Sequence, residues 1–218
     1  MLVLAGPEPL DRDEEVAVKS SAWKFGLSVV DQRRFEISND PRQRDSSNIA
    51  LLTGKARHDV VWLIDTDGEF GRYVPFATQQ PRPVVGHEGL SAVAWHWTSE
   101  RYGAPQLNQR FRRLAKRDMT SLDWTAWVAF RVVVAAVEKC RTSDRVALAD
   151  AIRNGVAIDL CKGPPGSVRS WVGQLRQPIL LATHNAVIAT APLRGFEHQF
   201  DTLDTLGPED SESKCALP

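Results

Sequence analysis

Short apolar runs separated by amphipathic stretches dominate the first ninety residues. Four of these runs predict buried β-strands at residues 2–5, 27–30, 60–64 and 83–85. Two intervening segments predict helices, one from Asp11 to Gly26 and one from Ser47 to Gly54, with Asp11 and Ser47 as the capping residues. Strands that alternate with helices in this way predict right-handed βαβ units and a parallel sheet flanked by helices.

Apolar residues at helical spacing define the expected inward faces of the helices. The middle of the chain predicts three further helices: residues 105–117, residues 118–141 and a segment that opens at Ser143. The expected inward residues are Val16, Ala17 and Trp23, then Leu107, Phe111 and Leu114, then Trp124, Trp127, Val128, Val132 and Ala135, and finally Val146, Leu148, Ala149 and Ile152. Such helices need a partner layer, which is either the first sheet or a sheet that this chain lacks.

The last part of the chain returns to strands. Residues 179–182 and 186–189 flank Thr183-His184-Asn185 and predict a β-hairpin. The pattern as a whole divides the chain into an α/β core at residues 1–90, a second region at residues 91–200 and a loose, polar tail at residues 201–218.

Composition excludes several classes of function. The chain has 218 residues, and its 27 basic residues balance its 27 acidic ones, so we expect no nucleic-acid partner. The basic run from Arg110 to Arg117 is interpreted as a solvated helix face. No segment approaches the roughly 20 apolar residues that a membrane span needs, so we expect no membrane insertion. The apolar run at the start is too short for a signal peptide, and as written the chain would stay in the cytoplasm.

The cysteines and histidines do not have the spacing of metal ligands. Cys140, Cys161 and Cys215 are far apart, and the sequence leaves open whether two of them pair or all three are reduced. The five histidines are scattered, so we expect neither a metal site nor a cofactor. His96 lies between Trp95 and Trp97, a cluster that is typical of packing.

Polar residues that follow the predicted strands are the candidate ligand contacts. In open α/β sheets, ligands bind beyond the carboxyl ends of the strands, where the loops meet. The candidate ligand-binding residues are Glu8 after the first strand, Asp65, Thr66, Asp67 and Glu69 after the third, and His87 and Glu88 after the fourth. This acidic set suits an amine, a metal or a polyhydroxylated ligand better than a phosphate.

One part of this set also supports an enzymatic alternative. Asp65-Thr66-Asp67-Gly68 after an apolar strand resembles the first motif of haloacid-dehalogenase-type phosphatases, in which Mg²⁺ assists a carboxylate nucleophile and a carboxylate acid. Glu69 stands where that motif usually has a small or β-branched residue, and no downstream Lys and paired Asp complete such a site. A loop that caps the following helix is the simpler interpretation.

Several motifs in sequence order resemble one family. They are Phe70–Phe76, Pro81–Gly86, Ala94–Trp97, Arg101–Leu107 with Arg110-Phe111, Asp118–Trp127, Ser170–Pro178 and Leu203–Gly207. Together they resemble the ABC transporter substrate-binding proteins that accompany alcohol oxidation by enzymes that depend on pyrroloquinoline quinone (PQQ). These are relatives of the branched-chain amino acid binding proteins, and the likeness runs from the first strand to the tail.

The resemblance implies an α/β, type I periplasmic-binding-protein-like fold with two lobes that close on a ligand. It implies that this chain is the C-terminal portion of such a protein and that the first lobe is largely missing. It also implies that the protein is a periplasmic, non-catalytic, solute-binding component of an ABC-type transport system. The implied partners are a small-molecule ligand, the ABC transporter membrane subunits and a PQQ-dependent dehydrogenase. A scaffold for a PQQ alcohol dehydrogenase that binds no small molecule is the third hypothesis. A fragment or a misplaced start codon would explain the absent export signal.

Overall fold

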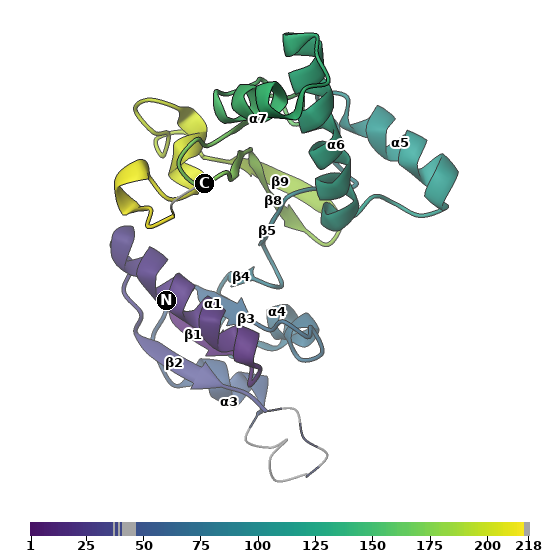
Figure 1. Cartoon of the computed structure of the whole chain (residues 1–218). Helices are drawn as coiled ribbons and strands as arrows, with labels where there is room; N and C mark the ends of the chain where they lie inside the picture. The colour runs from purple at the N-terminus through teal and green to yellow at the C-terminus, as the bar shows by residue number, and fades with distance from the viewer. Residues whose placement is uncertain (37, 39, 41–46, 216–218) are drawn as a thin grey trace. The chain divides into compact units, whose positions relative to one another are not determined.

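The computed structural model describes residues 1–36, 38, 40 and 47–215 (Figure 1). The chain divides into two compact units, which we call unit 1, Met1–Ala92, and unit 2, Val93–Pro218. Within the described residues, no helix combines the length and the apolar character needed to cross a bilayer.

Unit 1 is built on a parallel sheet. Its strands are β1 (Leu2–Ala5), β2 (Asp31–Arg34), β3 (Val61–Ile64) and β4 (Val84–Gly86), in the order β2-β1-β3-β4. Ala5 pairs in register with Arg34 and with Ile64, and Leu63 pairs with Gly86. All pairs are parallel, which confirms the predicted α/β fold with a parallel sheet. The carboxyl ends of the strands therefore all lie along one side of the sheet, which we call the edge of unit 1.

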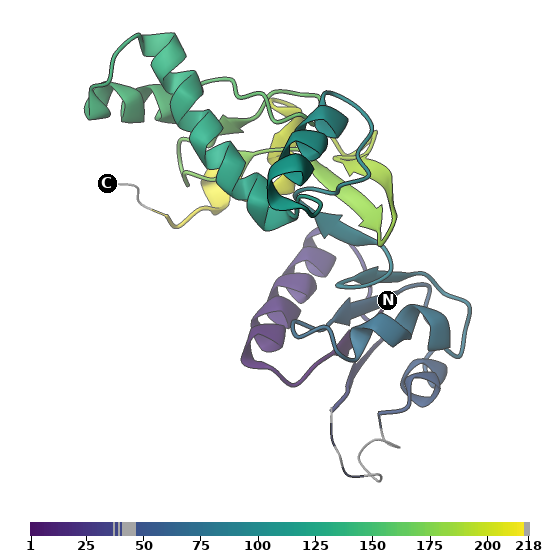
Figure 2. The same ribbon diagram turned by 90° about the vertical axis from the view of Figure 1, so that its right-hand side faces the viewer.

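Both faces of this sheet are covered by helices. Successive β1 residues enter opposite clusters: Leu2 and Leu4 pack on one face, Val3 and Ala5 on the other. The first face is covered by α3 (Ile49–Gly54) and by η1 (Gly71–Tyr73) with α4 (Val74–Ala77). The second face is covered by α1 (Pro9–Lys24), as Figure 2 shows. Burial of each aliphatic side chain stabilises the fold by about 1.5 to 3 kcal/mol. Strands covered on both faces are therefore continuous apolar runs, and such runs predicted β1 and β3.

The predicted second strand was wrong by four residues. Residues 27–30 precede β2, and the chain's polar segment Asp31–Arg34 forms the strand. Because β2 is the outermost strand of the sheet, its position follows from backbone pairing with β1. This pairing begins where Val30 N–H donates to Met1 O at 2.9 Å. Phe35 then supplies the buried side chain that the apolar run was expected to supply.

The predicted helix caps and the inward face of the first helix also need correction. Glu8, not Asp11, is the residue that precedes α1, and Asn48, not Ser47, caps α3 by accepting from Leu51 N–H at 3.2 Å. In α1, Val18 and Ala22 lie four residues apart and so share one face of the helix, and this face packs against the sheet. Trp23 lies one position further round the helix and is 86% exposed, so it is not part of the core.

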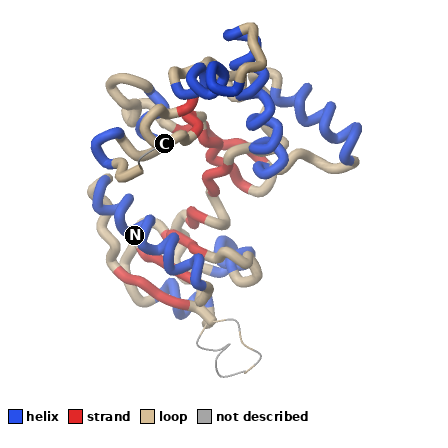
Figure 3. Tube along the Cα trace, in the orientation of Figure 1, coloured by secondary structure: helices blue, strands red, loops and turns tan. Residues whose placement is uncertain are grey.

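Unit 2 combines helices with short strands. Its helices are α5 (Ala104–Ala115), α6 (Ser121–Cys140) and α7 (Arg145–Arg153), and the short 3₁₀ segments are η2 (Thr202–Leu206) and η3 (Asp210–Glu212). The chain enters unit 2 within β5 (Ser91–Val93), which belongs to the sheet β5-β8-β9 with β8 (Ile179–Thr183) and β9 (Ala186–Ala191). β6 (Ser167–Val168) and β7 (Leu175–Arg176) form a separate antiparallel pair. Figure 3 shows these strands in red beside the blue helices. The β8–β9 hairpin confirms the prediction.

A tryptophan pair organises the core of unit 2. The rings of Trp95 and Trp124 stack with centroids 6.2 Å apart, and Met119, Ile158 and Leu160 pack around them. The predicted inward stripe of α6 is confirmed, since Trp124 and Val128 are buried and Trp127, Val132 and Ala135 pack on the same cluster. At α6, Thr120 N–H donates to Asp123 Oδ2 at 2.9 Å, and Asp123 N–H donates back to Thr120 Oγ1 at 3.3 Å.

Several other predicted core positions were wrong. Leu114 is 86% exposed because it lies in the last turn of α5, one turn beyond the packed residues Leu107 and Phe111. Val16, Ala17, Val146 and Ala149 are exposed as well. The three cysteines, whose pairing the sequence left open, are all free.

Residues 201–207 are not the loose tail that we expected. Leu203 and Asp204 are buried, and Asp204 accepts hydrogen bonds from Arg169 and Arg176. Trp171 Nε1–H donates to Pro208 O at 3.1 Å, which fixes the following residue too. The segment is therefore anchored by polar contacts that its acidic composition did not reveal. The last three residues of the predicted tail, 216–218, lie outside the described residues.

Candidate functional site

The candidate ligand contacts of unit 1 follow three neighbouring parallel strands. Glu8 follows β1, the segment from Asp65 to Glu69 follows β3, and His87 with Glu88 follows β4. Since Ala5 is in register with Ile64, and Leu63 with Gly86, these loops leave the sheet at the same edge. The structure thus brings the loops that hold the predicted residues to one side of the sheet.

Asp11 in the first turn of α1 ties the first two of these loops together. Its carboxylate is buried and accepts from Glu8 N–H at 3.1 Å and from Thr66 N–H at 2.9 Å. A carboxylate near a helix N-terminus is also favoured by the helix dipole. Asp11 was considered only as a cap in the sequence, yet it holds the β1 and β3 loops in place.

His87 links the β4 loop to the β3 loop and to α1. Its Nδ1 accepts from Asp65 N–H at 3.1 Å, and its Nε2 lies 2.7 Å from Glu14 Oε2. Because Nδ1 accepts a hydrogen bond, the proton of the neutral ring sits on Nε2 and is donated to Glu14. Gly86 precedes it at φ +114°, where a Cβ would lie 2.2 Å from Leu63 O, so only glycine allows this close approach.

Asp65 is used by the loop itself. Asp65 is only 4% exposed, and its Oδ2 accepts a hydrogen bond from Gly71 N–H. Burial raises the pKa of Asp65 and the nearby carboxylates of Asp67 and Asp11 add to this, against the backbone hydrogen bonds from Gly71 and Gly68. A phosphatase would need this carboxylate as an accessible nucleophile, so the geometry does not support that alternative.

The remaining acidic residues of the edge are accessible. Asp67 and Glu69 are exposed, with Asp67 Oδ1 accepting from Glu69 N–H at 2.9 Å, and Glu8 is exposed as well. Thr66 and Glu88 are partly buried. The described residues contain no group of three or more His, Cys, Asp or Glu side chains that could hold a metal ion. This edge therefore offers carboxylates that could accept hydrogen bonds from a cationic or polyhydroxylated ligand.

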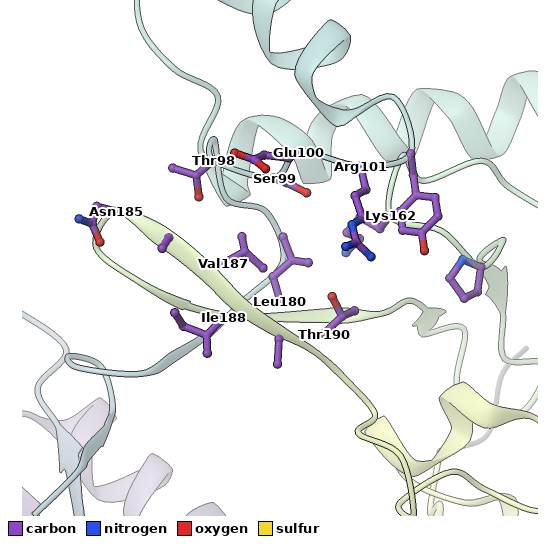
Figure 4. A pocket seen from close by; sticks show the side chains of 14 residues that line it. Thr98, Ser99, Glu100, Arg101, Lys162, Leu180, Asn185, Val187, Ile188 and Thr190 are labelled. Carbon is purple, nitrogen blue, oxygen red and sulfur yellow. The ribbon is translucent and has the colours of Figure 1, made fainter.

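A second candidate site lies wholly within unit 2. A cavity of about 660 Å³ is bounded by the loop from Thr98 to Tyr102, by Lys162 and Pro164, and by Leu180 with residues 185–190 of the hairpin. Figure 4 shows the Arg101 side chain extending from its loop toward β9, while Glu100 lies further along the loop. Tyr102 and Gly103, at φ 57° and 81°, form a left-handed turn before α5. A left-handed non-glycine residue is strained, as is common at binding sites.

Lys162 is the buried cation of this cavity. It is 3% exposed, and its Nζ donates to Ala94 O at 2.8 Å, to Gln177 Oε1 at 2.6 Å and to Pro178 O at 2.7 Å. The same Nζ lies 3.8 Å from the centroid of the Trp124 ring. Burial lowers the pKa of Lys162 to about 7.

The sequence did not predict this second site. Arg101 and Tyr102 were noted only as part of a motif, and Lys162 stands in no recognisable pattern. A usable signal was Tyr102-Gly103 directly before a helix with Pro105 in its first turn, since this combination predicts a fixed turn.

Comparison with known proteins identifies the fold. No protein-family model matches the chain, and no curated protein sequence matches it. Solved structures do match. A branched-chain amino acid ABC transporter periplasmic ligand-binding protein from Burkholderia xenovorans has a TM-score of 0.70 and 15% identity, covering 99% of this chain and 62% of its own. An ABC transporter substrate-binding protein from Sphaerobacter thermophilus has a TM-score of 0.69 and 15% identity, covering 93% and 61%. An amino acid ABC transporter substrate-binding protein from Pseudomonas fluorescens has a TM-score of 0.68 and 12% identity, covering 99% and 62%.

The chain therefore has the fold of the type I periplasmic binding proteins, as the family resemblance implied. It spans about three fifths of the length of the solved structures that it matches. At 12–15% identity the likeness establishes the fold, and function must be argued from the sites.

Proposed function

We propose that this chain is part of a solute-binding protein that serves an ABC-type uptake system outside the cytoplasmic membrane. The observation that carries the proposal is the fold, which the chain shares over nearly its whole length with ABC transporter substrate-binding proteins. The acidic edge of unit 1 supports it, because the loops that follow the parallel strands are where this class of sheet binds ligands. The protein binds and does not catalyse.

The proposed ligand contacts are Glu8, Thr66, Asp67, Glu69 and Glu88. His87, whose ring nitrogens are bound to Asp65 N–H and Glu14, positions the β4 loop beside them. Asp65, whose carboxylate is bound to Gly71 N–H, supports the β3 loop behind them. Exposed carboxylates favour a ligand with a positive charge or several hydroxyl groups. The fixed backbone of these loops, held by Asp11 and His87, favours binding because little conformational freedom is lost.

The proposed mechanism is closure of two lobes over the ligand. Unit 1 supplies one wall of the site, and the ligand is held between it and a second lobe. The membrane subunits of the transporter then recognise the closed form. On this mechanism, solute transport requires both lobes. This chain spans only part of the length of its structural relatives.

The more specific proposal links this system to PQQ-dependent alcohol oxidation. It rests on the ordered motifs from Phe70–Phe76 to Leu203–Gly207. On this proposal the protein is periplasmic and works beside a PQQ-dependent dehydrogenase.

The experiment that tests the ligand site compares a double carboxylate variant at the proposed site with a single carboxylate variant elsewhere as the control. Asp67 lies beyond the carboxyl end of β3, whereas Asp59, also exposed, precedes its amino end. In the protein as it occurs in its source cells, the ligand-induced rise in melting temperature should be lost in Asp67→Asn combined with Glu88→Gln, and kept in Asp59→Asn. A ligand that stabilises all of these variants equally would refute the proposed contacts.

A further inference from the structure

The cavity of unit 2 is lined by more basic than acidic side chains. Arg101 and Lys162 line it, against one carboxylate, Glu100. The three hydrogen-bond acceptors of Lys162 are neutral oxygens. Within the part of the chain that the structure describes, the Arg101 side chain makes no hydrogen bond or ion pair, and Glu100 makes none with it. Lys162 is held in place by its contacts, so Arg101 is the cation that is free to bind a ligand.

The opposite wall of the cavity is apolar. Leu180 and Val187 face the loop that carries Arg101 (Figure 4), and the small side chains of Ala186 and Ala189 also line the cavity. Thr98, Ser99 and Thr190 add hydroxyl groups around the rim. The volume of about 660 Å³ lies within the range of small-molecule sites, roughly 300 to 1,000 Å³. The cavity therefore combines one free guanidinium with an apolar patch at Leu180 and Val187.

We propose that this cavity binds a small organic acid, with the carboxylate on the Arg101 guanidinium and the apolar part against Leu180 and Val187. A guanidinium presents two parallel N–H donors that match the two oxygens of a carboxylate. This site lies in unit 2 and does not depend on the acidic edge of unit 1. Either site can therefore fail without affecting the other.

Calorimetric titration of the 218-residue protein with matched probes tests the charge requirement. Hexanoate, hexan-1-ol and hexylammonium share one apolar chain and differ in the head group. Hexanoate should bind more tightly than hexan-1-ol by about ten- to a hundred-fold, the ratio that a charge-assisted hydrogen-bonded pair provides. Equal binding of the alcohol and the acid, tighter binding of the ammonium, or no binding of hexanoate to the folded protein would each overturn the proposal.

Arginine variants then locate the site. Arg101→Gln should lower hexanoate affinity to that of hexan-1-ol, and Arg101→Lys should restore part of it. Arg113→Gln is the matched control, because Arg113 is exposed on α5 and does not line the cavity. Circular dichroism checks that each variant is folded. Unchanged hexanoate affinity in folded Arg101→Gln would refute the role of Arg101.

A proton-linkage measurement separates this site from an adventitious anion contact at the surface. Burial lowers the pKa of Lys162 to about 7, so an anion bound in the cavity should raise it and cause proton uptake near pH 7. Titrations in buffers of different ionisation enthalpy should show this uptake in the natural protein and not in Lys162→Met. Binding without proton uptake would place the anion elsewhere and contradict the proposal.

Discussion

The buried carboxylate of Asp204 is the contact whose removal should damage unit 2 most. Its Oδ1 accepts from Arg169 Nε at 2.9 Å and from Arg176 Nε at 2.6 Å, and its Oδ2 accepts from Arg176 Nη2 at 3.0 Å. Asp204 is 6% exposed and Arg169 is 1% exposed. In Asp204→Asn the amide has one acceptor oxygen and no charge, so the Arg169 guanidinium remains buried without a counter-ion.

The expected cost is about 3 to 5 kcal/mol of unfolding free energy, the usual penalty for removing one partner of a buried ion pair. Arg169 keeps its bonds to Leu203 O and Gln174 Oε1, which places the value toward the lower end. The melting temperature should fall by about 6 to 20 °C. Thermal and urea unfolding followed by circular dichroism measure both quantities.

Asp201 supplies the matched control. Its Oδ2 lies 3.7 Å from Arg176 Nε and its side chain is 43% exposed, so Asp201→Asn should cost less than about 1 kcal/mol. Adding Arg169→Met to Asp204→Asn should recover part of the loss, because the uncompensated buried cation is then gone. If Asp204→Asn costs no more than Asp201→Asn, the argument from buried charge is refuted.

Acid should have the same effect as this substitution. Burial acts to raise the pKa of Asp204, but the hydrogen bonds and charges of Arg176 and Arg169 outweigh it and lower the pKa below the ordinary value of 3.8. The stabilisation is therefore complete above that value and is lost as the pH falls through the lower pKa of the folded state. The difference in stability between the natural protein and Asp204→Asn should shrink in that acidic range.

Three further predictions concern single residues. Gly86→Ala should destabilise unit 1 by about 1 to 3 kcal/mol in urea unfolding, since the new Cβ would meet Leu63 O at a positive φ; unchanged stability would contradict the close approach. Asp11→Asn should cost about 1 to 3 kcal/mol in the same assay, because one of the backbone N–H groups of Glu8 and Thr66 loses its acceptor; a neutral result would show that the loops are held otherwise. Burial lowers the pKa of Lys162 from 10.5 to about 7, so the unfolded chain binds more protons between these values and stability should rise with pH there; the same slope in Lys162→Met would refute this.

The sequence predicted the parallel sheet of unit 1 well because β1 and β3 are buried on both faces. Such strands must be continuous apolar runs, so the pattern is direct. The edge strand β2 is polar, and its pairing is set by backbone contacts that the sequence does not display. Trp23, which is exposed, was wrongly assigned to the core. Helical spacing predicts which residues share one face of a helix, but it does not predict which face packs against the sheet.

The candidate sites were predicted unequally. The edge of unit 1 followed from the rule for parallel strands, and its loops are local in sequence. The cavity of unit 2 draws on three segments, near Arg101, Lys162 and Val187, that only the fold brings together. The anchoring of Asp204 by Arg169 likewise joins residues 35 positions apart, so composition alone suggested a loose tail.

Native mass spectrometry of the protein isolated gently from the periplasm of its source cells tests the central claim most directly. The account predicts a periplasmic protein that carries a small molecule, seen as extra mass that is lost on denaturation, and whose retention requires Asp67 and Glu88. A protein found in the cytoplasm without bound solute, or one whose bound solute is unaffected by loss of both carboxylates, would contradict the account.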